Sequence, residues 1–246
     1  LLDSAERLVI QVHPTNEFAR KYFNSEFGKT ESWYILNDGG YVYIGFKPGI
    51  TREYFKELFE KQDIQAMLEC LHKFEVNKGD IIFVSGGVPH AIGAGCFLAE
   101  LQEPTDLMVI PERITPSGIA LADEKLHGGL GFEKMFDCFC YEGADKSETY
   151  KKYFKKPKHV NDNEKEIINH TMTDKFTLWE IEVSGSYIKN TDDYAIALVL
   201  DGEGECNSVS LKAYDRFFVP FGEKILNFTG NMRVLLCSPG KNNKEA

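Results

Sequence analysis

Four side chains in the N-terminal half of the chain have the types and the order that a divalent-cation site would need: Gln11, His13, Glu31 and His90. Gln11 and His13 are two residues apart, so on a strand both side chains leave the same face. Two imidazoles, one carboxylate and one amide oxygen suit Zn²⁺, and also Mn²⁺, Fe²⁺ or Co²⁺. Because the set holds no thiolate, it is compatible with a catalytic site that leaves a coordination position open. Spacing alone does not separate this interpretation from two hydrogen-bonded structural histidines.

The elements that must position these residues read as strands. Short aromatic and β-branched runs recur every 8–12 residues between Gly, Pro and Asp turns, which predicts a barrel or double-sheet jelly roll. The clearest runs are Ser32–Leu36, Gly40–Phe46, Ile81–Val84 and Cys96–Leu101. The turn residues 37–40 predict that the first two runs form a hairpin. Leu8–Ile10 predicts a buried strand, and since a domain rarely begins with one, we expect a segment to precede it.

Residues 51–71 carry the clearest helical pattern. Thr51 is suited to an N-cap, and apolar residues follow at helical spacing in two stripes that are interrupted at 61–63. Further on, lysines cluster around Pro157 and predict a solvated linker. Short strands resume after residue 176, with a turn expected at Asp201–Gly204, which indicates a second, smaller β domain.

Charge and cysteine usage exclude several classes of protein. The 246 residues include 38 acidic and 28 basic side chains, a net charge of −10, which argues against a nucleic-acid binder or attachment to an anionic membrane. No apolar run is long enough to cross a bilayer, and no signal peptide is recognisable. The six cysteines form no Cys-x-x-Cys pair, so we expect reduced, mostly buried thiols in a cytoplasmic protein.

The strings around the candidate ligands resemble those of the class I mannose-6-phosphate isomerases. They are QVHP at 11–14, GKTESWY at 28–34 and GVPHA at 87–91, with ELQ at 100–102. The resemblance covers roughly residues 8–102. It implies one zinc ion per chain, or another divalent ion, held by Gln11, His13, Glu31 and His90.

The resemblance also implies a mainly β fold. We expect a cupin-type double-stranded jelly roll with a helical insertion at about 51–71 in residues 1–145, and a linker at 146–170. Residues 171–246 resemble the family's metal-free C-terminal cupin only in pattern, and would form a second, degenerate cupin-like domain.

The implied activity is aldose–ketose isomerisation, most plausibly between mannose 6-phosphate and fructose 6-phosphate through an enediolate, so the expected partner is a small sugar phosphate. Isomerisation requires a general base that moves a proton between C1 and C2 of the sugar. The candidates for this base are Glu100 and a metal-bound hydroxide. Lys29 and Arg113 are the candidate cations for the substrate oxygens or phosphate. The family carries a Tyr-Arg pair after the ELQ string, and counting from Glu100 places that arginine at Ile110. Arg113 is the candidate replacement.

Two other functions stay open on this scaffold, because cupins host many chemistries. One is an iron- or manganese-dependent dioxygenase. The other is a non-catalytic sugar-phosphate-binding protein that keeps the metal but lacks the arginine. The sequence gives no expectation for the oligomeric state.

Overall fold

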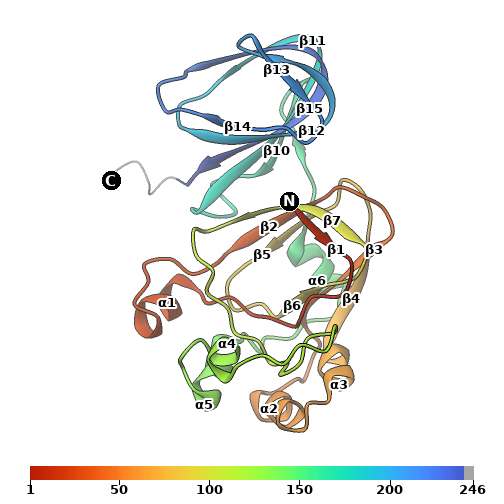
Figure 1. Cartoon of the computed structure of the whole chain (residues 1–246), viewed down its shortest axis with the longest axis vertical. Coiled ribbons are helices and arrows are strands. Elements are labelled where there is room, and N and C mark those ends of the chain that lie inside the picture. The colour runs from red at the N-terminus through yellow and green to blue at the C-terminus, as the bar shows by residue number, and fades with distance from the viewer. Residues whose placement is uncertain (241–246) are drawn as a thin grey trace. The chain divides into compact units, whose positions relative to one another are not determined.

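The computed structural model describes residues 1–240, and the chain divides into a first unit, Leu1–Lys155, and a second that begins at Lys156. The fold is mainly β, as expected, with antiparallel sheets in both units and the helices in the first (Figure 1). The strands of the first unit are β1 (Leu2–Ser4), β2 (Glu31–Ile35), β3 (Gly40–Phe46), β4 (Leu71–Val76), β5 (Ile81–Val84), β6 (His90–Ile92), β7 (Cys96–Gln102) and β8 (Phe154–Lys155).

Two sheets enclose the core of the first unit. One has the order β1-β7-β2-β5-β8 and the other the order β4-β3-β6. A single cluster of buried side chains draws on both, including Trp33 of β2, Ile82 of β5, Ile44 of β3 and Ile92 of β6. The sheets therefore face each other across this cluster, as in the double-sheet jelly roll that the sequence predicts.

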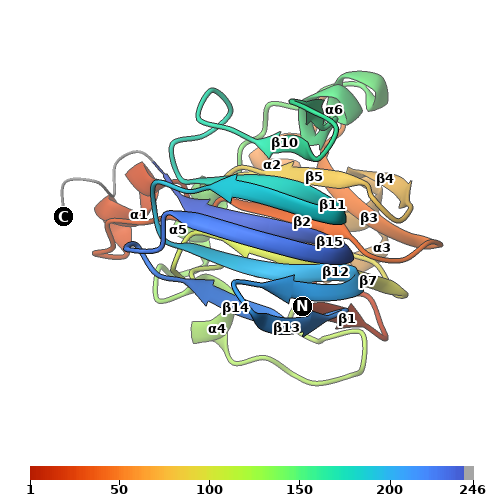
Figure 2. The ribbon, with the colours of Figure 1, turned by 90° about the horizontal axis from the view of Figure 1, so that it is seen from above.

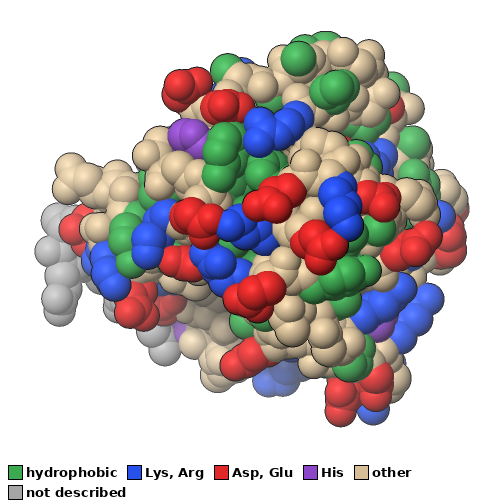
Figure 3. Space-filling model, turned by 90° about the horizontal axis from the view of Figure 1, so that it is seen from below, with side chains coloured by type: hydrophobic (Ala, Val, Ile, Leu, Met, Phe, Trp, Pro, Cys, Tyr) green, Lys and Arg blue, Asp and Glu red, His purple; other side chains and the backbone are tan. Residues whose placement is uncertain are grey.

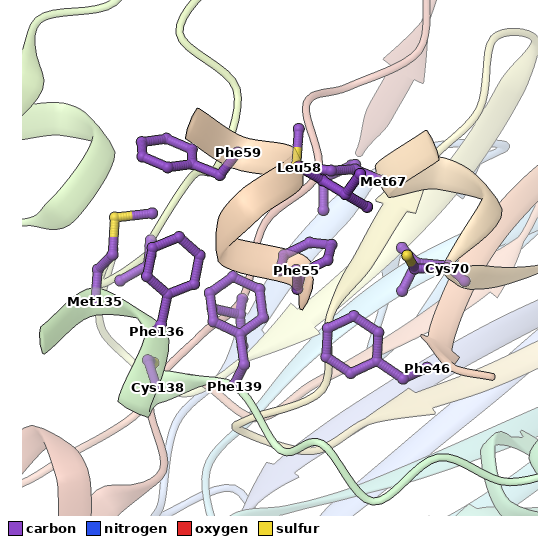
Figure 4. Close-up of a cluster of buried hydrophobic side chains, with 14 of the residues drawn as sticks. Phe46, Phe55, Leu58, Phe59, Met67, Cys70, Met135, Phe136, Cys138 and Phe139 are labelled. Carbon is purple, nitrogen blue, oxygen red and sulfur yellow. The ribbon is translucent and has the colours of Figure 1, made fainter. Parts of the chain in front are cut away.

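The helices of the first unit are α1 (Asn16–Tyr22), α2 (Arg52–Lys61), α3 (Ile64–Glu69), α4 (Asp123–His127), α5 (Phe132–Met135), the 3-10 turn η1 (Phe136–Cys138) and α6 (Lys146–Tyr153). Helices α2, α3 and α5 and the turn η1 contribute buried side chains to a second apolar cluster. Phe55 and Phe59 of α2 pack with Phe136 and with Phe139, which follows η1 (Figure 4). Their cluster also contains Ile10, Val12 and Ala91, the immediate neighbours of the candidate ligands. The helical segment thus supports the backbone that carries the site.

The helical insertion is confirmed, including its interruption. The Thr51 hydroxyl accepts a hydrogen bond from the Tyr54 amide and caps α2, as predicted. Gln62 ends α2 in the left-handed conformation, and Asp63 caps α3 through the Ala66 amide. The surface of the helical segment carries interleaved basic and acidic side chains (Figure 3), among them ion pairs of Arg52 with Asp137 and of Lys134 with the same carboxylate.

The predicted hairpin between β2 and β3 is wrong. Both strands exist, but β2 pairs with β5 and β7, whereas β3 pairs with β4 and β6. The turn residues between them instead carry the chain from one sheet to the other. Asn37 fixes this crossing, because its side chain donates to the Gly95 carbonyl and accepts from the Phe97 amide.

The linker expected at 146–170 consists largely of regular elements. Helix α6 and strand β8 occupy its first part, and Tyr153 and Phe154 join the core between the sheets. In the second unit, β9 (Lys158–His159) and β10 (Glu164–Ile168) follow. The lysines around Pro157 suggested a solvated segment, but the aromatic residues beside them decide the packing, because their burial stabilises the fold.

The second unit is a seven-stranded antiparallel sheet of order β13-β12-β15-β11-β10-β9, with β14 also paired to β12. Its remaining strands are β11 (Phe176–Asn190), β12 (Ala195–Cys206), β13 (Val209–Lys212), β14 (Arg216–Val219) and β15 (Ile225–Pro239). Three of them are long and lie side by side in the order β11-β15-β12 (Figure 2).

The turn expected at Asp201–Gly204 is instead a bend within β12, where the register with β15 shifts between Val199 and Asp201. Gly202 has φ 79°, and Gly230 of β15 has φ 105°. A Cβ on Gly230 would lie 2.6 Å from the Glu203 carbonyl oxygen. Glycine here permits close approach and bending of two continuous strands rather than chain reversal.

Two further expectations can be compared with the structure. No helix among the described residues is long and apolar enough to cross a membrane. All six cysteines are free thiols, and Cys70, Cys96, Cys138 and Cys206 are buried, in agreement with the sequence analysis.

Candidate metal centre

The first unit brings His13, Glu31 and His90 together, although they come from three separate segments. The His13 Nε2 atom lies 3.2 Å from Glu31 Oε2, and His90 Nε2 lies 3.2 Å from Glu31 Oε1. The two imidazole rings are 5.0 Å apart between centroids. All three side chains are buried, with at most 2% of each exposed, and they form the one group of this kind among the described residues.

Strand register explains why the three side chains meet. Glu31 alternates with Trp33 and Ile35 on β2, so it faces the core between the sheets. His90 alternates with Ile92 on β6 of the opposite sheet and faces the same interior. The cluster therefore spans the gap between the two sheets.

Backbone pairing brings His13 to the cluster. The Gln11 and His90 backbones exchange two hydrogen bonds of 2.9 Å, which place the extended segment alongside β6. Val12 forms a second bridge, with Val109, and its side chain packs into the helical cluster on the opposite side. Because successive side chains alternate, His13 is directed into the interior.

Both histidines are held in the tautomer that a metal requires. His13 Nδ1 lies 2.9 Å from the Leu107 carbonyl oxygen, and His90 Nδ1 lies 2.9 Å from the Val88 carbonyl oxygen. A carbonyl only accepts, so each Nδ1 carries the hydrogen and each Nε2 keeps its lone pair. Both lone pairs are on the atoms that approach Glu31.

One candidate ligand atom, His90 Nε2, is buried and has no hydrogen-bond partner. An unpaired buried polar atom costs folding free energy, and a bound cation would satisfy it. One ligand atom from each of the three residues lies within 4.8 Å of the others, so the donor set could hold a divalent cation.

Electrostatics favour the protonation states that bind a cation. Burial lowers the pKa of His13, against the opposing effect of Glu31, and so favours the neutral imidazole. The Lys29 ammonium, 3.2 Å from Glu31 Oε2, favours the ionised form of the Glu31 carboxyl. A neutral imidazole beside an ionised carboxylate is the combination that metal binding needs.

Lys29 and Glu100 extend the cluster. The Lys29 ammonium lies 3.2 Å from Glu31 Oε2, 3.3 Å from His13 Nε2 and 3.4 Å from Glu100 Oε1. Burial, and then the charge of Glu31, raise the pKa of Glu100. On β7, Glu100 is the register partner of Trp33, so its side chain leaves the sheet on the same face as Glu31. The carboxyl is therefore positioned beside the ligands without being one of the three.

Of the other residues singled out in the sequence, Gln11 is placed near the cluster by its backbone pairing, whereas Arg113 has no described contact with the cluster. Gln11 is half-buried next to His90, held there by the paired backbones. The Arg113 guanidinium is 4.9 and 4.5 Å from the ring centroids of Phe59 and Phe132, and it donates to Asp123. None of these partners belongs to the metal cluster. Ile110 is buried.

Several supporting residues escaped the sequence analysis. The Trp33 indole donates to Glu31 Oε1 at 3.1 Å and orients the carboxylate. Glu112 accepts hydrogen bonds from the Ile10 amide and from Arg7, and so anchors the segment that ends at His13. The spacing of Glu31 and Trp33 on one strand face was a usable signal, whereas nothing local in sequence links Glu112 to Arg7.

Known proteins with similar sequences and folds are mannose-6-phosphate isomerases. No family model matches the chain. GmuF, a probable mannose-6-phosphate isomerase of Bacillus subtilis, is 28% identical over 253 residues, covering 97% of this chain and 73% of that protein. A mannose-6-phosphate isomerase of Streptococcus mutans is 27% identical, covering 96% of this chain and 71% of that protein. The crystal structure of the mannose 6-phosphate isomerase from Bacillus subtilis matches with a TM-score of 0.76 and 20% identity, covering 96% of this chain and 73% of that chain.

The chain is similar to mannose-6-phosphate isomerases over nearly its whole length. The resemblance drawn from the QVHP, GKTESWY and GVPHA strings is thereby confirmed. The chain has the fold of these proteins and a His–Glu–His group that could hold a metal.

Proposed function

We propose that this protein is a zinc-dependent aldose–ketose isomerase that interconverts mannose 6-phosphate and fructose 6-phosphate. The observation that carries the proposal is the buried His13–Glu31–His90 cluster, in which His90 Nε2 has no hydrogen-bond partner. The names of the relatives supply the substrate class.

In this proposal His13 Nε2, His90 Nε2 and Glu31 hold the cation, and the Gln11 amide oxygen is the fourth protein ligand. When bound, the cation supplies Lewis-acid stabilisation of the oxyanion that develops on the sugar. The charges around it suit the substrate. Glu31, Glu100 and Lys29 together carry minus one when ionised, so a divalent ion brings the site to plus one. A positive site attracts a sugar phosphate despite the acidic character of the chain.

Glu100 is the residue that we assign to proton transfer between C1 and C2. It is the one carboxyl in contact with the cluster that is not a proposed ligand, and it is partly exposed, so substrate can reach it. Lys29 contacts both Glu100 and Glu31, and its ammonium is almost fully buried. We therefore assign it to the reacting sugar oxygens, where it donates hydrogen bonds and holds the Glu100 carboxylate in place.

One observation favours a second candidate, a sugar-phosphate-binding protein without turnover. The position expected to hold the substrate-contacting arginine is Ile110, which is buried. Its candidate replacement, Arg113, contacts Phe59, Phe132 and Asp123 instead.

Proton exchange separates the two candidates. The zinc-loaded protein is incubated with mannose 6-phosphate in D₂O, and the C2 proton is followed by NMR. We expect loss of the C2 signal together with appearance of the ketose. Glu100→Gln should retain zinc and lose the exchange. Binding of mannose 6-phosphate with neither exchange nor ketose would overturn the isomerase proposal in favour of the binding protein.

A further inference from the structure

A second cavity with the character of a binding site lies at the outer edge of the sheet β4-β3-β6. Its volume is about 340 Å³, within the size range of small-molecule sites. Lys73 of β4, Lys47 just beyond β3 and Lys146 at the start of α6 line it, so its basic residues come from three segments. It shares no residue with the metal cluster.

Lys47 and Lys146 form no ion pair with a carboxylate among the described residues, and in this they resemble Lys151 and Lys152 of α6 rather than Lys56 or Lys134. Lys146 lies 5.2 Å from the centre of the Phe74 ring. Lys73 lies 4.0 Å from the centre of the Tyr41 ring, and its carboxylate partner Glu75 is 3.9 Å away.

The balance of charge in the cavity opposes that of the whole chain. Three lysines and one carboxylate, Glu69, line it, so its formal charge is plus two in a chain with a net charge of −10. The Glu69 carboxylate accepts a hydrogen bond from Gln65. Ammonium groups gathered around one cavity repel one another, and an anion bound between them would relieve that repulsion.

The remaining walls indicate that the anion has an organic part. The half-buried Tyr43 ring supplies apolar surface beside the lysines, and Leu68 and Leu71 are buried beneath it. An apolar wall next to several cations suits a phosphate ester better than a bare inorganic ion.

The cavity is connected to the metal centre by strand pairing. On β3, Ile44 is the register partner of His72 of β4 on one side and of His90 of β6 on the other. His72 lines the cavity, and His90 is a candidate metal ligand. The two sites therefore lie at opposite edges of one three-stranded sheet, about 10 Å apart at the usual strand spacing.

We propose that this cavity is a second ligand site, which binds a small phosphate ester between Lys47, Lys73 and Lys146, separately from the metal centre. Calorimetric titration of the full chain with glucose 6-phosphate tests it, with inorganic phosphate and glucose as comparison ligands. We expect the ester to bind more tightly than inorganic phosphate, and glucose not to bind.

The variants locate the binding. Lys47→Ala/Lys146→Ala should weaken ester binding at least about tenfold, since two charge-assisted contacts are lost. Lys151→Ala/Lys152→Ala removes the same charge from α6 outside the cavity and should leave the affinity unchanged. His90→Leu, or a chelator, removes ligand binding at the metal centre and should leave the lysine-dependent binding in place. Lys146→Glu is a second variant that should abolish binding without altering the core.

Three outcomes would overturn the proposal: equal affinity in the two double variants, loss of binding in His90→Leu alone, or no binding at about 10 mM ester, which is weaker than a specific site would allow. Since turnover is not measured, failure of the isomerase proposal would leave this result intact.

Discussion

Replacing His90 with Leu should remove the bound metal while leaving the fold of the first unit in place. Leu has a similar volume to His but no ligand atom. The chain supplies a matched control in His72, which is also buried, also pairs with Ile44 and also bonds a backbone carbonyl, that of Ala144, at 2.8 Å. His72 contacts neither Glu31 nor His13 through any of its described interactions, so His72→Leu should keep the metal.

The size of the effect follows from the number of ligands. Four-ligand zinc sites bind with roughly 10–16 kcal/mol, or about 3 kcal/mol for each ligand. Losing His90 should therefore weaken metal binding by about 100-fold or more. Metal at about 1,000 times its dissociation constant stabilises the folded state by about 4 kcal/mol. For a unit of this size, that stabilisation raises the Tm by roughly 8–16 °C.

Two measurements check this prediction. After dialysis against buffered zinc, the native chain and His72→Leu should each hold about one ion per chain by elemental analysis, and His90→Leu should hold none. A chelator should lower the Tm of the first two proteins and leave that of His90→Leu unchanged. Equal zinc content in His90→Leu and His72→Leu would refute the assignment of His90 as a ligand.

Three further substitutions test other parts of the account. Lys29→Met should lower kcat/KM for mannose 6-phosphate by about 10²–10⁴-fold and retain zinc; zinc loss instead would make Lys29 structural. Glu112→Gln should destabilise the first unit by about 3 kcal/mol in urea unfolding, because it removes the partner of a buried charge, whereas the exposed Glu26→Gln should change stability by less than about 0.5 kcal/mol. Gly230→Ala should lower the Tm of the second unit, since its Cβ would lie 2.6 Å from a carbonyl oxygen. Gly222→Ala, which has open space around it, should leave the Tm unchanged. Equal effects of the two substitutions on Tm would contradict the bend in β12.

The three residues of the candidate metal cluster were predictable from strand alternation together with the resemblance of their surrounding strings to a known family. Alternation on a strand determines that Gln11 and His13 share a face, and that Glu31 shares one with Trp33. Their surrounding strings then matched a family. The supporting contacts were not predictable, because the carbonyls of Leu107 and Val88 come from segments whose proximity depends on the folded backbone.

The pairing of strands and the long bent strands were the features of the fold that the sequence did not predict. The turn between β2 and β3 has the composition of a hairpin, yet each strand pairs with other strands along both of its edges. Turn-forming residues report a local change of direction, whereas the partner of each strand depends on which apolar faces are buried together. The same limit explains Gly202 and Gly204, which suggested a turn and instead bend a continuous strand.

The most direct test of the account is anomalous diffraction at the zinc edge from a crystal of the zinc-loaded chain. We predict one strong peak in the first unit, about 2.0–2.2 Å from His13 Nε2, His90 Nε2 and a Glu31 oxygen. A peak located elsewhere, with these three side chains hydrogen-bonded to one another and to water, would contradict the claim that they form a metal centre.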